Sequence, residues 1–137
     1  MFTRVLAPRV RRLQVLGLCV AGLLLAGCGA TDQEVVSAAQ AFVGAAPAQA
    51  CGLLAPRTFE SLERRAGSAC PEALTKLALP HDTAVTGVEV AGERAQVRFS
   101  DEVLFLARFP EGWRVTDAGC TRSDPDQSVP YECEVEP

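Results

Sequence analysis

The chain predicts an α+β domain in which helices come first and an antiparallel sheet follows. Two observations indicate this. Apolar residues recur at helical spacing over residues 35–77, and from Ala84 onward they fall at every second residue. Short loops join the alternating segments, so neighbouring strands should pair antiparallel. We expect a core between the helices and one face of a sheet of four or more strands.

The first 27 residues have the order of a secretory signal peptide. A basic head holds four arginines and no acidic residue, and in the run Leu13–Leu25 the one polar side chain is Gln14. This length fits the roughly 7 to 15 apolar residues of a signal peptide and falls short of the roughly 20 of a spanning helix. We therefore predict an exported chain rather than a transmembrane helix.

The apolar run closes on Leu-Ala-Gly-Cys at residues 25–28, which resembles a bacterial lipobox. The resemblance implies cleavage before Cys28 and attachment of a diacylglyceryl group, whose two acyl chains would anchor the protein in the lipid bilayer. Residues 1–27 would be a lipoprotein signal peptide, 28–31 a short lipid-anchored tether, and 32–137 the domain. The expected location is the extracytoplasmic face of the cell membrane.

Removal of the signal leaves an acidic domain. Residues 28–137 hold nine basic and 17 acidic side chains, a net charge of −8. Because phosphate backbones are bound through basic patches, nucleic acid is not an expected partner. Arginine supplies every basic residue except Lys76, a bias typical of a GC-rich genome.

Four cysteines remain in the domain beyond Cys28. An even number in an exported domain predicts two disulfides, for which three pairings exist. We predict Cys51–Cys70 and Cys120–Cys133, because the members of each pair are close in sequence and lie within one region of the expected fold. A four-cysteine zinc site is the alternative, but zinc ribbons use cysteines only a few residues apart.

The first helix should begin at a capping box formed by Thr31 and Glu34. Apolar side chains then follow at helical spacing from Val35 to Ala46, and Pro47 ends the pattern.

Three shorter helices are expected next. A helical turn covers Ala48–Leu54, and a helix over Thr58–Ala66 ends at Gly67, which suits a left-handed terminus. Pro71 then opens a helix over Glu72–Leu77, since proline is favoured in a first turn.

The alternating residues assign the inward face of the sheet: Val88, Val90, Ala95, Val97, Phe99, Val103, Phe105, Ala107, Phe109, Trp113 and Val115. Gly92–Glu93 fits a two-residue hairpin turn, and Ser100–Glu102 and Pro110–Gly112 fit three-residue loops. This register places Phe99 opposite Val103.

The same register gathers five side chains on the opposite face of the sheet: Arg98, Leu104, Leu106, Arg108 and Arg114. Arg108 would stand directly opposite Arg114, at a cost of a few tenths of a kcal/mol. In an acidic domain this cluster is a candidate contact surface for an envelope protein or a second copy of the chain. The alternative is a solvated face on which arginine stems cover the leucines.

Several segments are similar to small actinobacterial lipoproteins of the NTF2-like superfamily: Ala50–Pro56, Cys70–Leu74, Gly112–Val115, Gly119–Cys120 and Tyr131–Cys133. The resemblance implies a cone in which N-terminal helices pack into a curved antiparallel sheet. The lipoprotein group carries no assigned reaction, while proteins with this cone include polyketide cyclases, epoxide hydrolases and transport or interaction modules. Fold alone therefore does not choose a function.

No catalytic set stands out. His81 precedes Asp82 and could form an acid–base pair, but both lie in a link, where adjacent side chains point apart. Asp124 and Asp126 have a D-x-D spacing without the rest of a calcium loop. We expect loop residues at all four positions, and neither a metal nor a cofactor.

Two functions remain open. One is a membrane-anchored, non-enzymatic interaction or accessory module of the cell envelope. The alternative is binding of a small apolar ligand, or a cyclase- or hydrolase-like reaction, in the cone pocket. A cone filled by Phe99, Phe105 and Trp113 favours the first, whereas a pocket reached by His81 or an acid favours the second.

Overall fold

The structure is a computed structural model that describes residues 27–137, with side chains from Thr31 onward. Four helices precede four strands, which confirms the α+β prediction. The elements are α1 Gly27–Val43, α2 Pro47–Cys51, α3 Pro56–Ala66, α4 Cys70–Leu77, β1 Gly87–Ala91, β2 Arg94–Arg98, β3 Val103–Phe109 and β4 Gly112–Cys120. Residues 1–26 of the predicted signal peptide and the Cys28 side chain lie outside the described part.

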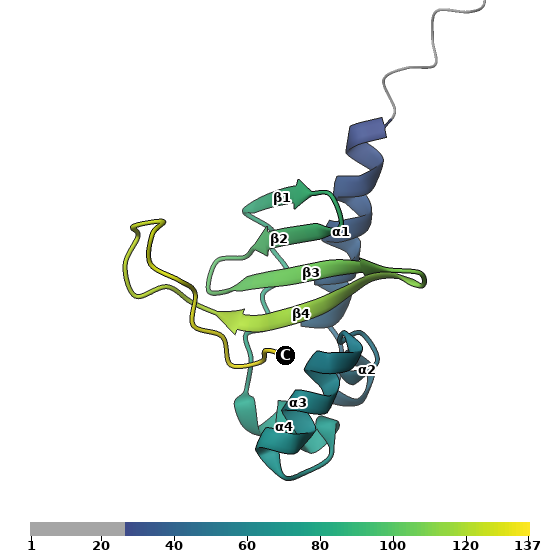
Figure 1. Cartoon of the computed structure of the whole chain (residues 1–137), viewed down its shortest axis with the longest axis vertical. Coiled ribbons are helices and arrows are strands. Elements are labelled where there is room, and N and C mark those ends of the chain that lie inside the picture. The colour runs from purple at the N-terminus through teal and green to yellow at the C-terminus, as the bar shows by residue number, and fades with distance from the viewer. Residues whose placement is uncertain (1–26) are drawn as a thin grey trace, which may run out of the picture.

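The strands form one open antiparallel sheet in the order β1-β2-β3-β4. Helix α1 crosses one face of it, and α2, α3 and α4 gather beyond β4 (Figure 1). Val35, Ala39 and Phe42 of α1 are buried because their spacing of four and three residues puts them on the side that meets the sheet. Within residues 27–137 no helix has both the length and the apolarity to cross a membrane.

Helix α1 begins earlier than predicted. It starts at Gly27, so Thr31 lies inside the helix and the capping box with Glu34 is not its beginning. The range 28–31, predicted as a tether, is helical. No proline interrupts this range, and extending an existing helix adds one backbone hydrogen bond for each residue fixed.

Both predicted disulfides are present. Cys51–Cys70 joins the end of α2 to the start of α4, and Cys120–Cys133 joins the end of β4 to the C-terminal segment. The predicted left-handed end of α3 is also confirmed, since Gly67 has φ 62°. The helices occur in the predicted order, but α1 already ends at Val43, and Pro47 opens α2, which ends at Cys51, because proline suits the first turn of a helix.

The β2–β3 turn is shorter than predicted. Arg98 pairs with Val103, and the Phe99 N–H donates to the Glu102 carbonyl at 2.9 Å, which leaves a two-residue turn at Ser100 and Asp101. A shift of one residue turns every side chain of a strand to the other face. The predicted inward residues of β3, among them Phe105 and Phe109, therefore face outward.

The β3–β4 turn is shorter as well. Phe109 pairs with Gly112 and Arg108 pairs with Trp113, so the predicted pairing of Arg108 with Arg114 is wrong. This second shift cancels the first, and Trp113 and Val115 of β4 are buried as predicted.

The inner sheet face and α1 enclose the core. Leu104 and Leu106 of β3 are 0% and 1% exposed, in register with Val97 and Ala95 of β2. The edge of β4 is partly covered, because residues 53–55 and 132–135 bond to it through their backbones. Strand β1 forms the open edge of the sheet.

Candidate functional site

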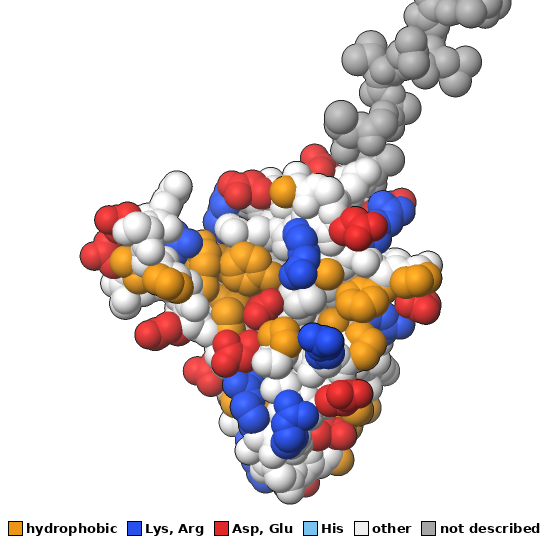
Figure 2. Space-filling view, viewed as in Figure 1, with side chains coloured by type: hydrophobic (Ala, Val, Ile, Leu, Met, Phe, Trp, Pro, Cys, Tyr) orange, Lys and Arg blue, Asp and Glu red, His pale blue; other side chains and the backbone are white. Residues whose placement is uncertain are grey.

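The candidate site is the face of the sheet that α1 does not cover, here called the outer face. Alternation along the paired strands assigns to it Glu89, Arg94, Gln96, Arg98, Phe105, Ala107, Phe109, Arg114 and Asp117. Figure 2 shows apolar, basic and acidic side chains interspersed over this face of the sheet. Aromatic residues and arginine are enriched in protein interfaces, so an uncovered sheet face that carries both is a candidate contact surface.

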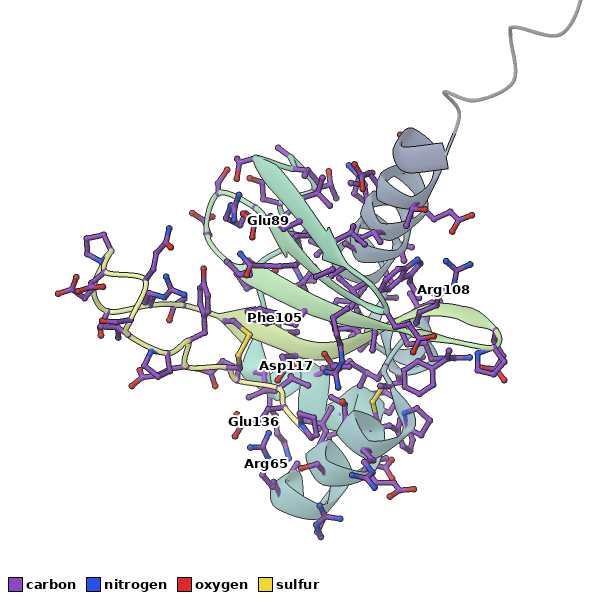
Figure 3. The ribbon with its side chains drawn as sticks, turned by 45° about the horizontal axis from the view of Figure 1, so that its top comes forward. Arg65, Glu89, Phe105, Arg108, Asp117 and Glu136 are labelled. Atoms are coloured by element: carbon purple, nitrogen blue, oxygen red, sulfur yellow. A yellow bond between two sulfur atoms is a disulfide. The ribbon has the colours of Figure 1, made fainter. Side chains whose placement is uncertain are left out.

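The predicted contact surface forms only in part. Arg98 and Arg114 lie on the outer face, but Leu104 and Leu106 are buried in the core. Arg108 belongs to the inner side of β3, where its guanidinium lies 5.9 Å from the centre of the Trp113 ring. Figure 3 shows Arg108 close to the β3–β4 turn, away from Phe105 and Asp117.

A hollow of about 610 Å³ opens between the outer face and the start of α3. Its walls are mainly apolar and include Pro56, Ala107 and Phe109, while Arg57 and Arg94 bring positive charge to it and Asp117 one negative charge. The Thr58 hydroxyl donates to the Thr116 carbonyl at 2.9 Å and fixes the start of α3 beside β4. The hollow is therefore built by two elements far apart in sequence.

An aromatic cluster lies on the same face. The Tyr131 ring meets Phe105 edge to face, with centroids 5.3 Å apart. The guanidinium of Arg122 lies 3.9 Å from the Tyr131 centroid, within the range of a cation–π interaction. This cluster joins the C-terminal segment to the outer face, so the segment extends the surface.

The arginines of this face have few carboxylate partners. Arg98 forms an ion pair with Glu89 at 3.0 Å. The Arg114 guanidinium donates to the Gly52 carbonyl, which holds it over the link between α2 and α3. Among the residues from 31 to 137, neither Arg57 nor Arg94 forms an ion pair.

His81 and Asp82 do not form an acid–base pair. The His81 Nδ1 donates to the Val43 carbonyl at 2.9 Å. Asp82 accepts from the Ala84 N–H at 2.9 Å, and this bond together with one from Ser100 lowers the pKa of its carboxyl. Both side chains thus bond to other groups, as their position in a link predicts.

The loop aspartates are engaged in turns. Asp124 accepts from the Asp126 N–H at 2.8 Å, and Asp126 accepts from the Ser128 N–H at 2.9 Å. The bond from Ser128 lowers the pKa of Asp126. Across the described chain, no three histidine, cysteine, aspartate or glutamate side chains come together as metal ligands.

The sequence pattern does not predict one buried carboxyl group, that of Glu102. Glu102 is 4% exposed and accepts from the Gly119 N–H at 2.8 Å. Burial raises its pKa, the Gly119 bond and the charge of His81 lower it, and Asp101 raises it again. Its position at the end of a turn gave no hint of burial, because that depends on the packing of β4 and the C-terminal segment.

A second, smaller hollow of about 250 Å³ lies between the end of α1, α2 and α4. Phe42, Leu74 and Pro80 give it an apolar wall, and His81 lines it as well. The sheet interior itself is occupied, since Phe99 and Trp113 are buried, while Phe105 is outside.

Comparison of the chain with protein-family models, with curated proteins and with solved structures finds no match.

Proposed function

We propose that this protein is a lipid-anchored lipoprotein of the extracytoplasmic face of the cell membrane, which acts as a non-enzymatic interaction module of the envelope through its outer face. The observation that carries this proposal is the uncovered outer face, with aromatic and basic side chains side by side. Residues 25–28 and the two disulfides support an exported location, because disulfides persist in oxidising compartments.

The fold proposed for this module is an NTF2-like cone. Support comes from the segments similar to that superfamily, from the order of helices before strands, and from α1 lying across one sheet face. In such a cone the inner face either packs or holds a ligand. Here Phe99, Leu106 and Trp113 occupy it, which favours a packed core over a reaction chamber.

The anchor is tested by changing Cys28 to alanine. The wild-type chain should incorporate labelled palmitate and sediment with membranes, whereas Cys28→Ala should do neither. Incorporation of label into the variant, or a wild-type chain that stays in the cytosol, would contradict the anchor.

The contact surface is tested in cells with a photocrosslinking residue at Arg94 on the outer face. A matched residue at Lys76, exposed on α4, is the control. We expect crosslinks to a discrete envelope protein from position 94 and none from position 76. Identical patterns from both positions would argue against a dedicated face.

A second function is favoured by the hollow at the helical end, whose wall is apolar. A small apolar ligand would fit there, with the His81 ring at its wall. Titration of the full chain with a fluorescent fatty acid tests this, with Thr75→Trp to fill the hollow from its rim. Saturable binding that Thr75→Trp abolishes supports a ligand site, and binding unchanged by it opposes one.

A further inference from the structure

We infer that the outer face binds an acidic polypeptide segment that carries apolar side chains. This inference rests on the proposed function, since it takes the outer face as the contact surface and adds the chemistry of the partner. Three observations lead to it: the distribution of charge on the outer face, the lining of the hollow beside α3, and the orientation of the outer face relative to the long axis of the molecule.

Positive charge is concentrated on this face of an acidic domain. Five of its nine basic residues lie on or beside it: Arg57, Arg94, Arg98, Arg114 and Arg122. Three acids stand against them: Glu89, already paired with Arg98, Asp117 in the lining of the hollow, and Asp126, whose carboxylate interacts with the charge of Arg122. Because the rest of the domain is acidic, an acidic partner is attracted to this face and repelled elsewhere.

The hollow gives the partner its apolar part. Ala107 and Phe109 form its floor on β3, and Pro56 stands at the start of α3. Two arginines, Arg57 and Arg94, line the same hollow against one acid, Asp117, so carboxylates on either side of an inserted apolar side chain would pair with the arginines. Arginine and aromatic residues are enriched where binding energy is concentrated in protein interfaces.

Two other occupants fit less well. An isologous dimer would place the outer face of one copy, with its five arginines, against the same basic face of the second copy. A bilayer is a continuous anionic surface. The outer face is directed sideways from the long axis of the molecule, and α1 begins at one end of that axis (Figure 1), so the face would not meet a bilayer at that end.

The test measures fluorescence anisotropy of a labelled octapeptide of aspartate, glutamate, phenylalanine and leucine, titrated with the full chain in neutral detergent. A lysine-for-acid version of the peptide is the specificity control. We expect saturable binding of the acidic peptide only, weakened as salt rises. Equal binding of both peptides, or none of the acidic one, would overturn the inference.

Charge reversal locates the site. The double variant Arg57→Glu with Arg94→Glu should weaken acidic-peptide binding at least about tenfold. Arg64→Glu with Lys76→Glu makes the same change of charge off the face, on exposed positions of α3 and α4, and should leave binding within about twofold. Equal losses in both double variants would mean that net charge, and not this face, binds the peptide.

A vesicle-binding measurement distinguishes a peptide-binding face from a lipid-binding one. Vesicles of phosphatidylglycerol that bind wild-type protein, but not the Arg57/Arg94 double variant, would assign the face to the bilayer and overturn the inference. Failure of the peptide with retained crosslinks from position 94 would reject only the acidic partner. Loss of those crosslinks as well would reject the proposed function.

Discussion

Glu102 closes the β2–β3 turn and, among residues 31–137, is one of four buried polar or charged residues. Its carboxylate receives one backbone N–H, from Gly119, at the junction of β4 and the C-terminal segment. The raised pKa follows from this position, because burial disfavours the charged form more than one hydrogen bond and His81 favour it.

Stability should therefore depend on the protonation of Glu102. The native state holds this proton more tightly than the unfolded state, whose pKa lies near the ordinary 4.5. Its favourable contribution is thus fully present below that value and lost as pH rises through the folded pKa. Glu102→Gln should flatten this fall, which urea unfolding between about pH 4 and about pH 7 measures.

The exposed Glu111, in the β3–β4 turn, supplies the control, since it does not act on the pKa of Glu102 and Glu111→Gln should leave the fall in place. A Glu102→Gln profile as steep as that of wild type would show that another group causes it.

Gly119 has a backbone that alanine tolerates poorly. Its φ is +64°, and an added Cβ would lie 2.8 Å from Leu79 Cδ2. Gly92 shares the positive φ, at +61°, but has open space around it. We expect Gly92→Ala to lower the free energy of unfolding by about 1 kcal/mol and Gly119→Ala by about 2–4 kcal/mol. Equal losses in denaturant unfolding would rule out the steric part.

Strand β3 shows what the sequence could and could not predict at the scale of elements. Periodicity located all four strands, and β1, β2 and β4 present the predicted faces. In β3 apolar side chains occur at both parities, with Leu104 and Leu106 on one side and Phe105 and Phe109 on the other. Alternation alone cannot orient such a strand. The lengths of the two turns that flank β3 determine which of its faces is buried.

The candidate site was predictable to the same extent. Arg98 and Arg114 were placed on the outer face because β2 and β4 were oriented as predicted. Phe105 and Phe109 were missed through the slip of β3. Arg57 and the hollow beside it depend on where α3 docks on β4, and no local pattern in the sequence reports that contact.

The first disulfide should contribute strongly, because α2 spans five residues and is too short to be stable by itself. Replacing Cys51 and Cys70 together by serine should cost about 3 kcal/mol. For a domain of this size that lowers the melting temperature by roughly 10 °C or more. Calorimetry of the oxidised protein and the double variant measures the loss; unchanged melting would mean that packing alone holds α2 on α4.

At the scale of the whole molecule, α1 is both a core helix and a projecting stalk. Asp32 to Glu34 are exposed, and Val35 is its first buried residue among the side chains described. The backbone from Gly27 to Val35 thus spans about 12 Å beyond the core. An anchor at Cys28 would hold the domain through helix rather than through a flexible linker.

This stalk predicts a fixed orientation on the membrane. In vesicles with nitroxide-labelled headgroups, NMR signals near the start of α1 should broaden most and those of α3 and α4 least. The start of α1 lies at one end of the long axis of the molecule, and α3 and α4 lie at the other end (Figure 1). Five glycine and serine residues inserted between Gly29 and Ala30 should reduce this gradient. A wild-type domain broadened evenly would contradict the stalk.

The placement of the two disulfides has a mechanical consequence. Both close loops that leave out α1, which meets the sheet through the noncovalent packing of Val35, Ala39 and Phe42. Tension applied at the amino end would therefore load that packing in shear, with no cross-link to share the force. Unfolding under tension would therefore begin where α1 packs on the sheet, while the two regions closed by disulfides stayed cross-linked.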